Sequence, residues 1–137
     1  MDLNNLNDKQ LEAVKSIGSP ILIFAGAGSG KTRVLTYKIA YLIKEVGLPP
    51  QSILAVTFTN KAALEMKSRV QELLDFDISE ISIGTFHSIS AQILRKEIHN
   101  IGISNNFIIY DQTDSLSVIK DSIKDLGLDV KQFEPKT

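Results

Sequence analysis

A glycine-rich segment that ends in Lys-Thr, AGAGSGKT at residues 25–32, places the strongest constraint on the fold of this chain. It follows the apolar run PILIFA at residues 20–25 and precedes a segment with helical periodicity. The apolar run is short, β-branched and flanked by Pro20 and Gly26, which is typical of a strand buried on both faces. A buried strand, a glycine-rich turn and a helix in this order favour a loop that holds nucleotide phosphates.

The predicted loop supplies backbone and side-chain groups for a magnesium nucleotide. Its glycines permit conformations in which successive N–H groups point at phosphate oxygens, and the positive end of the next helix adds to this attraction. We expect Lys31 to reach the β and γ phosphates and Thr32 to place its hydroxyl on Mg²⁺. Ala25 stands where this loop pattern begins with glycine, and a small side chain still permits the turn. The residues predicted to bind nucleotide here are Ala25, Gly26, Ala27, Gly28, Ser29, Gly30, Lys31 and Thr32.

Strand and helix patterns alternate over the first hundred residues. Apolar residues recur at helical spacing over residues 31–46, and Gly47 ends that segment. A strand is then predicted at 53–58, a helix at 60–74, a short strand at 81–84 and a helix at 86–98. A shorter helix is expected to begin at Asn7, which forms a capping pair with Gln10, and to reach Ile17. The alternation predicts an α/β fold, a parallel sheet flanked by helices.

The pattern changes after residue 99. FIIYD at 107–111 could be a strand, residues 114–129 predict a helix, and VKQFEPKT at 130–137 shows no convincing structure. We therefore expect a boundary near residues 100–112.

Composition excludes several classes of protein. The formal net charge of -1, from 15 Lys and Arg against 16 Asp and Glu, gives no whole-chain electrostatic argument for nucleic acid. The chain has no cysteine, which excludes disulfide and thiolate chemistry. Neither a signal-peptide pattern nor an apolar stretch of about 20 residues is present, so we expect a soluble, cytoplasmic protein with no membrane partner.

Two further loops are predicted at the edge of the sheet that carries the phosphate loop, because ligands bind outside the carboxyl ends of parallel strands. Each begins with Thr-Phe, at residues 57–58 and 85–86, and continues with small polar or basic side chains. Such a surface could stack bases and bind a nucleic-acid backbone. From spacing alone, core phenylalanines and helix-capping polar residues are the more favoured interpretation.

Four motifs taken together resemble a known family. LNDKQLEAV, AGAGSGKT, AVTFTNKAALEM and GTFHS, in this order and spacing, closely resemble the start of the superfamily 1 DNA helicases of the UvrD/Rep/PcrA-like group. The resemblance covers residues 6 to about 128. It implies a truncated P-loop NTPase (RecA-like) fold with a short helical C-terminal extension. Residues 1–111 would form the first part of motor domain 1A, and residues 112–137 would begin the inserted helical domain 1B.

The resemblance also implies roles for particular residues. Gln10 would pair with the adenine base, to which an amide offers one donor and one acceptor, and Arg33 would lie against that base. The resemblance also favours DNA contact over a core position for the phenylalanines of the two Thr-Phe loops. The implied contacts to single-stranded DNA are Phe58, Thr59, Asn60, Lys61, Thr85, Phe86 and His87.

The function implied by the resemblance is that of an ATP-dependent DNA helicase or translocase. Such a motor couples Mg-ATP hydrolysis to movement along single-stranded DNA and to unwinding at duplex junctions. The family's Asp-Glu-x-Gln-Asp motif and the arginines of a second motor domain are not found in these residues. We therefore expect this chain to bind nucleotide without efficient turnover.

Two other interpretations remain open at the level of the sequence. Asp111, at the end of the apolar run 107–111, could be the Mg²⁺-side carboxylate of a self-contained small P-loop ATPase or kinase. Gln112 stands where a catalytic glutamate often follows, which disfavours this enzyme. The chain could also be a non-catalytic nucleotide-binding module.

Overall fold

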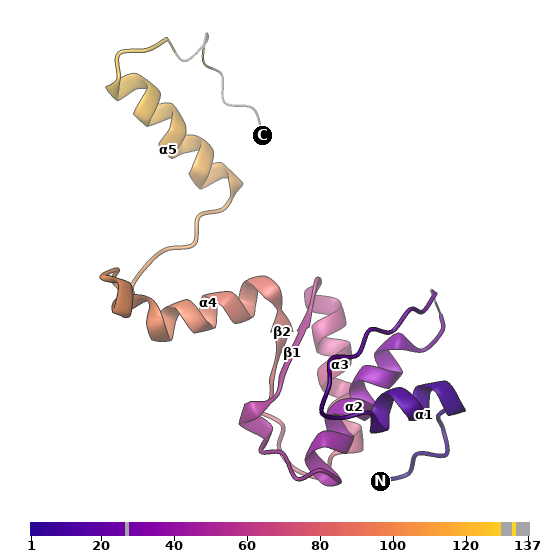
Figure 1. The fold of residues 1–137 in the computed structure, drawn as a ribbon. Coiled ribbons are helices and arrows are strands. Elements are labelled where there is room, and N and C mark those ends of the chain that lie inside the picture. Colours follow the sequence, from indigo (N-terminus) through magenta and orange to yellow (C-terminus); the bar gives the residue numbers. More distant parts are fainter. Residues whose placement is uncertain (27, 130–132, 134–137) are drawn as a thin grey trace. The chain divides into compact units, whose positions relative to one another are not determined.

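The computed structural model describes residues 1–26, 28–129 and 133. The chain divides into two compact units, Met1–Leu94 and Arg95–Thr137. Figure 1 shows the elements in chain order, which are α1 (Asp8–Lys15), α2 (Lys31–Lys44), β1 (Leu54–Thr57), α3 (Asn60–Leu73), β2 (Ser82–Thr85), α4 (Phe86–Glu97) and α5 (Gln112–Asp125), with short 3₁₀ helices at Pro50–Ser52 and Ile98–Ile101. The predicted mixed α/β class is confirmed. None of the described helices is long and apolar enough to cross a membrane.

The sheet of the first unit consists of β1 and β2, which pair in parallel. Leu54 lies opposite Ser82 at one end of the pair, and Thr57 lies opposite Thr85 at the other. Helix α3 packs on both strands, α2 packs on α3, and α1 packs on α2. The predicted parallel pairing is confirmed, and the carboxyl ends of both strands meet at one edge.

The core of the first unit lies between α2, α3 and the strands. Met66, Val70 and Leu73 recur at helical spacing along α3; the first two are buried and the third packs against the core. These faces bury because the apolar side chains recur at the 3.6-residue period of the helix. The buried residues of this cluster are Ile39, Ala40, Ile53, Met66, Val70, Leu74, Ile81 and Ile83.

Local capping chemistry sets the bounds of α1 and α2. The Asn7 side chain accepts a hydrogen bond from the Gln10 N–H, and the Gln10 side chain accepts one from the Asn7 N–H, so the predicted capping pair is confirmed. Helix α1 ends at Lys15, and Ile17 therefore lies beyond it. Gly47, at φ +79°, turns the chain after α2 so that the Leu48 N–H donates to the Leu42 carbonyl at 2.9 Å.

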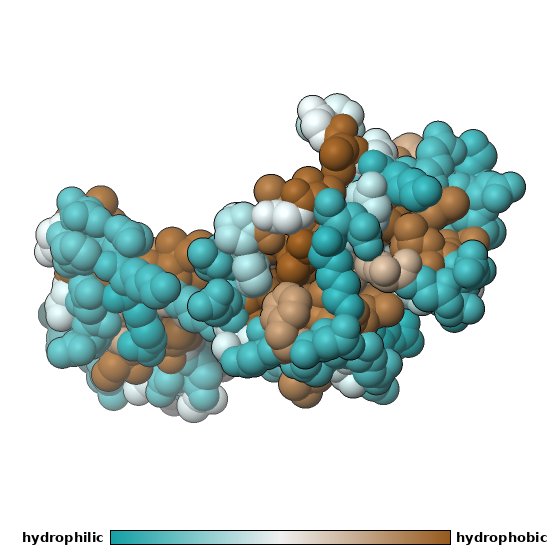
Figure 2. Space-filling model, turned by 90° about the horizontal axis from the view of Figure 1, so that it is seen from below, coloured by the Kyte–Doolittle hydropathy of each residue, from teal (hydrophilic) through white to brown (hydrophobic). Residues whose placement is uncertain are grey.

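The predicted strand at residues 20–25 is wrong. The segment is in no strand, and Leu22 and Phe24 are 77% and 90% exposed. A strand requires a hydrogen-bonding neighbour, and in the described part of the chain β1 and β2 pair with each other while residues 20–25 pair with neither. The apolar side chains of this run are therefore exposed rather than buried. Figure 2 shows hydrophobic side chains at the surface among hydrophilic ones.

The second unit begins within α4 and continues through α5. The Arg95 guanidinium lies 5.0 Å from the centre of the Phe107 ring, and the Asn105 side-chain amide donates to the Arg95 carbonyl at 2.8 Å. Residues 107–111 form no strand, so that possibility is not realised. The helix predicted at residues 114–129 is confirmed as α5, which ends at Asp125 and buries none of its residues. Apart from Phe133, residues 130–137 lie outside the described part.

Candidate nucleotide and nucleic-acid sites

The glycine-rich loop lies between the exposed segment 20–25 and the first residue of α2. Gly28 and Gly30 have φ angles of +74° and +90°, in the left-handed region that side chains rarely adopt. The expectation that this loop requires glycine is met at both positions. It is not met at Gly26, which lacks a positive φ and where an added Cβ atom would meet no atom within 4 Å. Ala27, another predicted nucleotide-binding residue, lies outside the described residues.

Lys31 is folded onto the loop that precedes it. Its Nζ donates hydrogen bonds to the Ala25 carbonyl at 2.9 Å and to the Gly26 carbonyl at 2.7 Å. The Ser29 hydroxyl also donates to the Gly26 carbonyl, at 2.7 Å. No described side chain caps the N-terminus of α2, where the first N–H groups have no acceptor within the helix. An ammonium group and free N–H groups at a helix N-terminus suit an anionic ligand such as phosphate.

Gln10 reaches the phosphate loop from α1. Its side-chain Nε2 donates to the Ser29 carbonyl at 3.1 Å, while its Oε1 accepts from the Asn7 N–H at 3.1 Å. A Cβ atom at Gly30 would lie 2.7 Å from Gln10 Nε2, so a side chain there would displace the end of the Gln10 side chain from the loop. In one conformation Gln10 therefore caps α1 and contacts the phosphate loop, and its predicted contact with adenine remains a prediction. A pocket of about 160 Å³ lies beside this contact, lined by Asn7, Lys9, Gln10, Ala13, Ile23, Phe24, Ala25, Ser29, Lys31 and Val34.

Arg33 and Thr32 follow directly in the first turn of α2. Arg33 is exposed, and its Nη1 donates to the Asn5 carbonyl at 3.4 Å. Thr32 is partly buried. Within residues 1–26, 28–129 and 133, no three His, Cys, Asp or Glu side chains gather into a metal-binding group. The predicted role of the Thr32 hydroxyl as a Mg²⁺ ligand, and the alternative role of Asp111, remain predictions.

Lys38 was missed by sequence reasoning and fixes the position of α1. Its Nζ donates to the carbonyls of Val14 at 3.0 Å, of Ala13 at 3.4 Å and of Ser16. Burial lowers the pKa of the Lys38 ammonium from its ordinary value. The signal in the sequence was a lysine three residues after Leu35 and one before Ile39, within the apolar periodicity of the helix.

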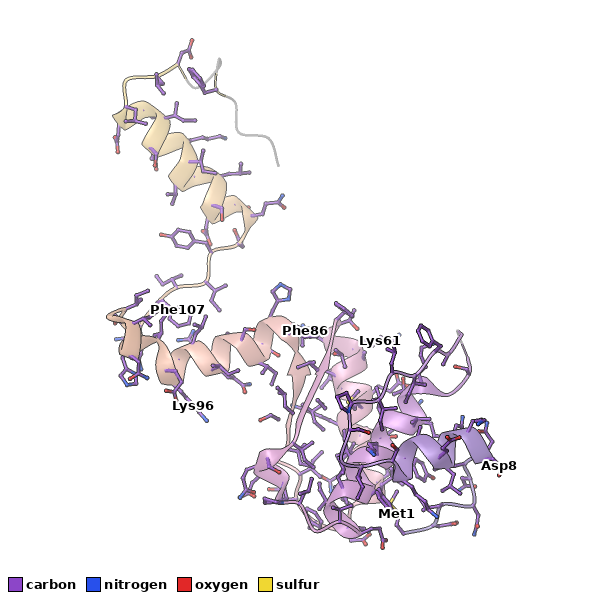
Figure 3. All side chains as sticks on the ribbon, viewed as in Figure 1. Met1, Asp8, Lys61, Phe86, Lys96 and Phe107 are labelled. Atoms are coloured by element: carbon purple, nitrogen blue, oxygen red, sulfur yellow. The ribbon has the colours of Figure 1, made fainter. Side chains whose placement is uncertain are left out.

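Two phenylalanines meet at the carboxyl ends of the strands. The rings of Phe58 and Phe86 lie 5.4 Å apart between centroids, with an interplanar angle of 44°. Phe58 is 88% exposed and Phe86 is 48% exposed, so the interpretation that both are core residues is wrong. Figure 3 shows Phe86 at the start of α4 and Lys61 at the start of α3, at the same end of the sheet. The two Thr-Phe loops therefore form one aromatic surface.

The polar residues of these loops divide into two groups. Thr59 caps α3, since its hydroxyl accepts from the Ala62 N–H at 3.2 Å. Thr85 is buried and exchanges hydrogen bonds with Ser88, so the helix-capping interpretation is confirmed for Thr59 and Thr85. Three other predicted contact residues are exposed, and the described part of the chain gives their side chains no hydrogen-bond or ion-pair partner: Asn60, Lys61 and His87.

Comparisons with known proteins agree on one family. A family model described as the UvrD/REP helicase N-terminal domain matches residues 6–137. Over 134 residues the chain is 54% identical to the ATP-dependent DNA helicase PcrA of Staphylococcus aureus and 53% identical to the protein of the same name from Staphylococcus epidermidis. These matches cover 98% of this chain and 18% of each relative, so the chain spans about a fifth of the length of the curated relatives it matches.

Proposed function

This chain belongs to the UvrD/REP helicase N-terminal domain family, and we propose on that premise that it is the ATP-binding first part of an ATP-dependent DNA helicase or translocase. The motor would couple ATP hydrolysis to movement along single-stranded DNA and to unwinding at duplex junctions. The proposal includes a P-loop NTPase (RecA-like) architecture, with residues 1–111 in motor domain 1A and residues 112–137 beginning domain 1B. The proposal also includes a cytoplasmic location.

The phosphate loop supports the nucleotide part of this proposal. Lys31 places its ammonium among loop carbonyls, within the same segment as the uncapped N-terminus of α2. A triphosphate would offer this ammonium oxygens with far more negative charge than the carbonyls of Ala25 and Gly26. Gln10, whose amide lies against the loop, would then be placed to bind adenine, with Arg33 beside the base. The chain's contribution is to bind and orient the nucleotide.

Magnesium is part of the same proposal. A divalent cation bound to the β and γ phosphates would neutralise charge that develops during phosphoryl transfer. Thr32, the residue after Lys31, would bind it through its hydroxyl oxygen, a hard donor of the kind that Mg²⁺ prefers. The remaining ligands would come from the nucleotide, from water and from carboxylates.

One observation carries the DNA part of the proposal: Phe58 and Phe86 form an exposed aromatic pair at the carboxyl edge of the sheet. Exposed rings beside unpartnered polar and cationic side chains suit stacked bases and a phosphate backbone. A module that only bound nucleotide would have no need of this surface. Thr59 and Thr85 would contribute by capping the first turns of α3 and α4. Asn60, Lys61 and His87 would contact the single-stranded DNA.

The self-contained enzyme that uses Asp111 is not favoured. The Asp111 side chain accepts from the Asp114 N–H at 2.8 Å and caps α5, and residues 107–111 form no strand that would present it at a sheet edge. The family match also extends through this segment to residue 137. Asp111 therefore has a structural role that requires no metal.

The experiment that tests the proposal is to measure ATP binding and ATP hydrolysis by the 137-residue chain, with and without single-stranded DNA. We expect binding without efficient turnover. The family's Asp-Glu-x-Gln-Asp motif, which supplies carboxylates for Mg²⁺, and the arginines that contact the γ phosphate are not among these residues. The Lys31→Ala variant is the matched control for binding. Appreciable turnover that Asp111→Asn abolished would favour the self-contained enzyme, and absence of nucleotide binding would contradict the whole proposal.

A further inference from the structure

We propose that a groove between α3 and the β2–α4 segment binds the nucleotide of a single strand that lies next to the nucleotide stacked on Phe58. The groove has a volume of about 300 Å³ and is lined by Asn60, Ala63, Leu64, Lys67, Ile83, Gly84, Thr85, Ser88 and Gln92. Lys67 would contact the phosphate, and Gln92 would contact the base. Neither residue belongs to the predicted DNA-binding set, and the inference rests on the proposed function.

Two residues that line the groove are close neighbours in sequence of the aromatic pair. Asn60 follows Phe58 by two residues and Thr85 directly precedes Phe86, and both line the groove. The parallel register places Thr57 opposite Thr85, so the groove reaches the edge of the sheet that is followed by the two rings. A strand whose base stacked on Phe58 would therefore have its neighbouring nucleotide at the mouth of this groove.

The lining combines an apolar floor with unused polar side chains. Ala63 and Ile83 are buried, and Leu64 is exposed toward solvent. Ser88 exchanges hydrogen bonds with Thr85, whereas the structure records no protein partner, within its described residues, for the side chains of Asn60, Lys67 or Gln92. An apolar surface suits the face of a base, and an amide offers both a donor and an acceptor to its edge.

The charge of the groove favours a polyanion. No aspartate or glutamate is among its lining residues, and Lys67 has no carboxylate partner among the described residues. Arg69, two residues further along α3, differs because it forms an ion pair with Glu65 at 2.5 Å. An unpaired lysine at the rim of a groove retains its ammonium group for an incoming phosphate, and such contacts depend strongly on salt.

The test is a titration of the ¹⁵N-labelled 137-residue chain with an oligothymidylate of about ten nucleotides, a length within the usual site sizes for single strands. NMR follows the side-chain amides of Asn60 and Gln92 and the backbone amides near Phe58 and Lys67 at once. We expect both groups of signals to shift along one binding curve. This readout detects weak binding and shows in the same experiment whether a variant remains folded.

Variants then separate this inference from the proposed function. We expect Lys67→Met to weaken binding about fivefold at low salt and to reduce the slope of log affinity against log salt by roughly 0.7, the value for one phosphate contact on a single strand. Lys67→Arg should retain the slope, and Gln92→Ala should weaken binding without changing it. Lys15→Met, which removes an exposed cation from α1, is the control for net charge.

Each outcome has one meaning. Shifts at Phe58 together with losses in Lys67→Met and Gln92→Ala beyond that of Lys15→Met would support the groove. Shifts confined to the Phe58 region, with Lys67→Met equal to Lys15→Met, would overturn the groove while the DNA-binding proposal stood. If no signal shifts at either place, DNA binding by this surface fails, and the groove fails with it.

Discussion

At the scale of single residues, Lys31 has both a structural contact with the phosphate loop and a proposed contact with the nucleotide. A substitution of Lys31 removes both. Its ammonium is hydrogen-bonded to the carbonyls of Ala25 and Gly26, and it is also the cation proposed to bind the phosphates. We expect Lys31→Ala to weaken ATP binding by about a hundredfold or more, because charge-assisted hydrogen bonds to phosphate are among the strongest available. An ATP titration followed by calorimetry measures this. Lys15→Ala should bind as the parent does, and unchanged affinity in Lys31→Ala would contradict the assignment.

The aromatic pair gives a second prediction at this scale. Phe58→Ala and Phe86→Ala should reduce affinity for single-stranded DNA by about fivefold to a hundredfold each, the usual range for loss of one stacked base. Their cost in stability should stay near 1 kcal/mol, since these rings are exposed, whereas Leu74→Ala in the core should cost about 2–5 kcal/mol. Fluorescence anisotropy and urea unfolding measure the two effects. Large destabilisation with intact DNA binding would restore the core interpretation.

The candidate site could be predicted from the sequence only where the residues form a motif. Lys31 and Gln10 could be proposed because each stands at a fixed position in a local motif, the phosphate loop and the helix cap. Lys38, Lys67 and Gln92 stand in ordinary helical sequence, and their significance depends on what packs beside them. The residues packed beside these side chains are distant along the chain, so no local sequence pattern indicates the contact.

At the scale of elements, helices were predictable and one strand was not. The helical hydrogen bonds, the caps at Asn7 and the apolar period of α3 all involve residues within a few positions of one another. The strands β1 and β2 were also predicted correctly, and each has a neighbour. Residues 20–25 carry an equally strong strand pattern, yet they pair with neither strand. Strand propensity shows only that the side chains suit a sheet. A strand forms when another strand is present to pair with it.

One lysine of α2 hydrogen-bonds to the C-terminal end of α1. Lys38 donates to three carbonyls at the C-terminal end of α1, where a cation also interacts favourably with the helix dipole. We expect Lys38→Met to cost roughly 1–2 kcal/mol of stability and to lower nucleotide affinity, because α1 carries Gln10 to the phosphate loop. Urea unfolding and an ATP titration measure both. Lys38→Arg should lose less, and equal stability of the Met variant would contradict this role.

The link from α2 to the end of α3 should depend on pH. Lys44 donates to Asp75 at 2.8 Å, and this hydrogen bond and charge hold the pKa of the Asp75 carboxyl below its ordinary value. The unfolded chain therefore binds the proton more readily, so the stabilisation is present above pH 3.8 and is lost as the pH falls through the lower folded pKa. We expect Lys44→Met to be slightly less stable than the parent at neutral pH, with the difference vanishing in acid and shrinking in high salt. Urea midpoints across that range measure it, and a difference independent of pH would contradict the pairing.

At the scale of the whole molecule, local stability should differ sharply between segments of similar hydrophobicity. Helix α3 contributes Met66 and Val70 to the core, whereas α5 buries none of its residues and residues 20–25 have no strand partner. Amide hydrogens exchange slowly where opening requires exposure of a core and quickly where it does not. The sequence alone would rank the apolar run 20–25 among the best protected segments, and the structure ranks it among the least.

Hydrogen–deuterium exchange on the 137-residue chain separates these rankings. We expect amides in the middle of α3 to exchange slowest, and those of residues 21–25 and of α5 to exchange at rates close to an unfolded chain. Because the pattern of residues 20–25 suits a buried strand, the same amides should become protected in a longer chain that provides a neighbouring strand. Protection of residues 21–25 in the 137-residue chain itself would mean that the strand forms without that partner. The unpaired arrangement of this segment would then be wrong, and the phosphate loop would have a rigid support on both sides.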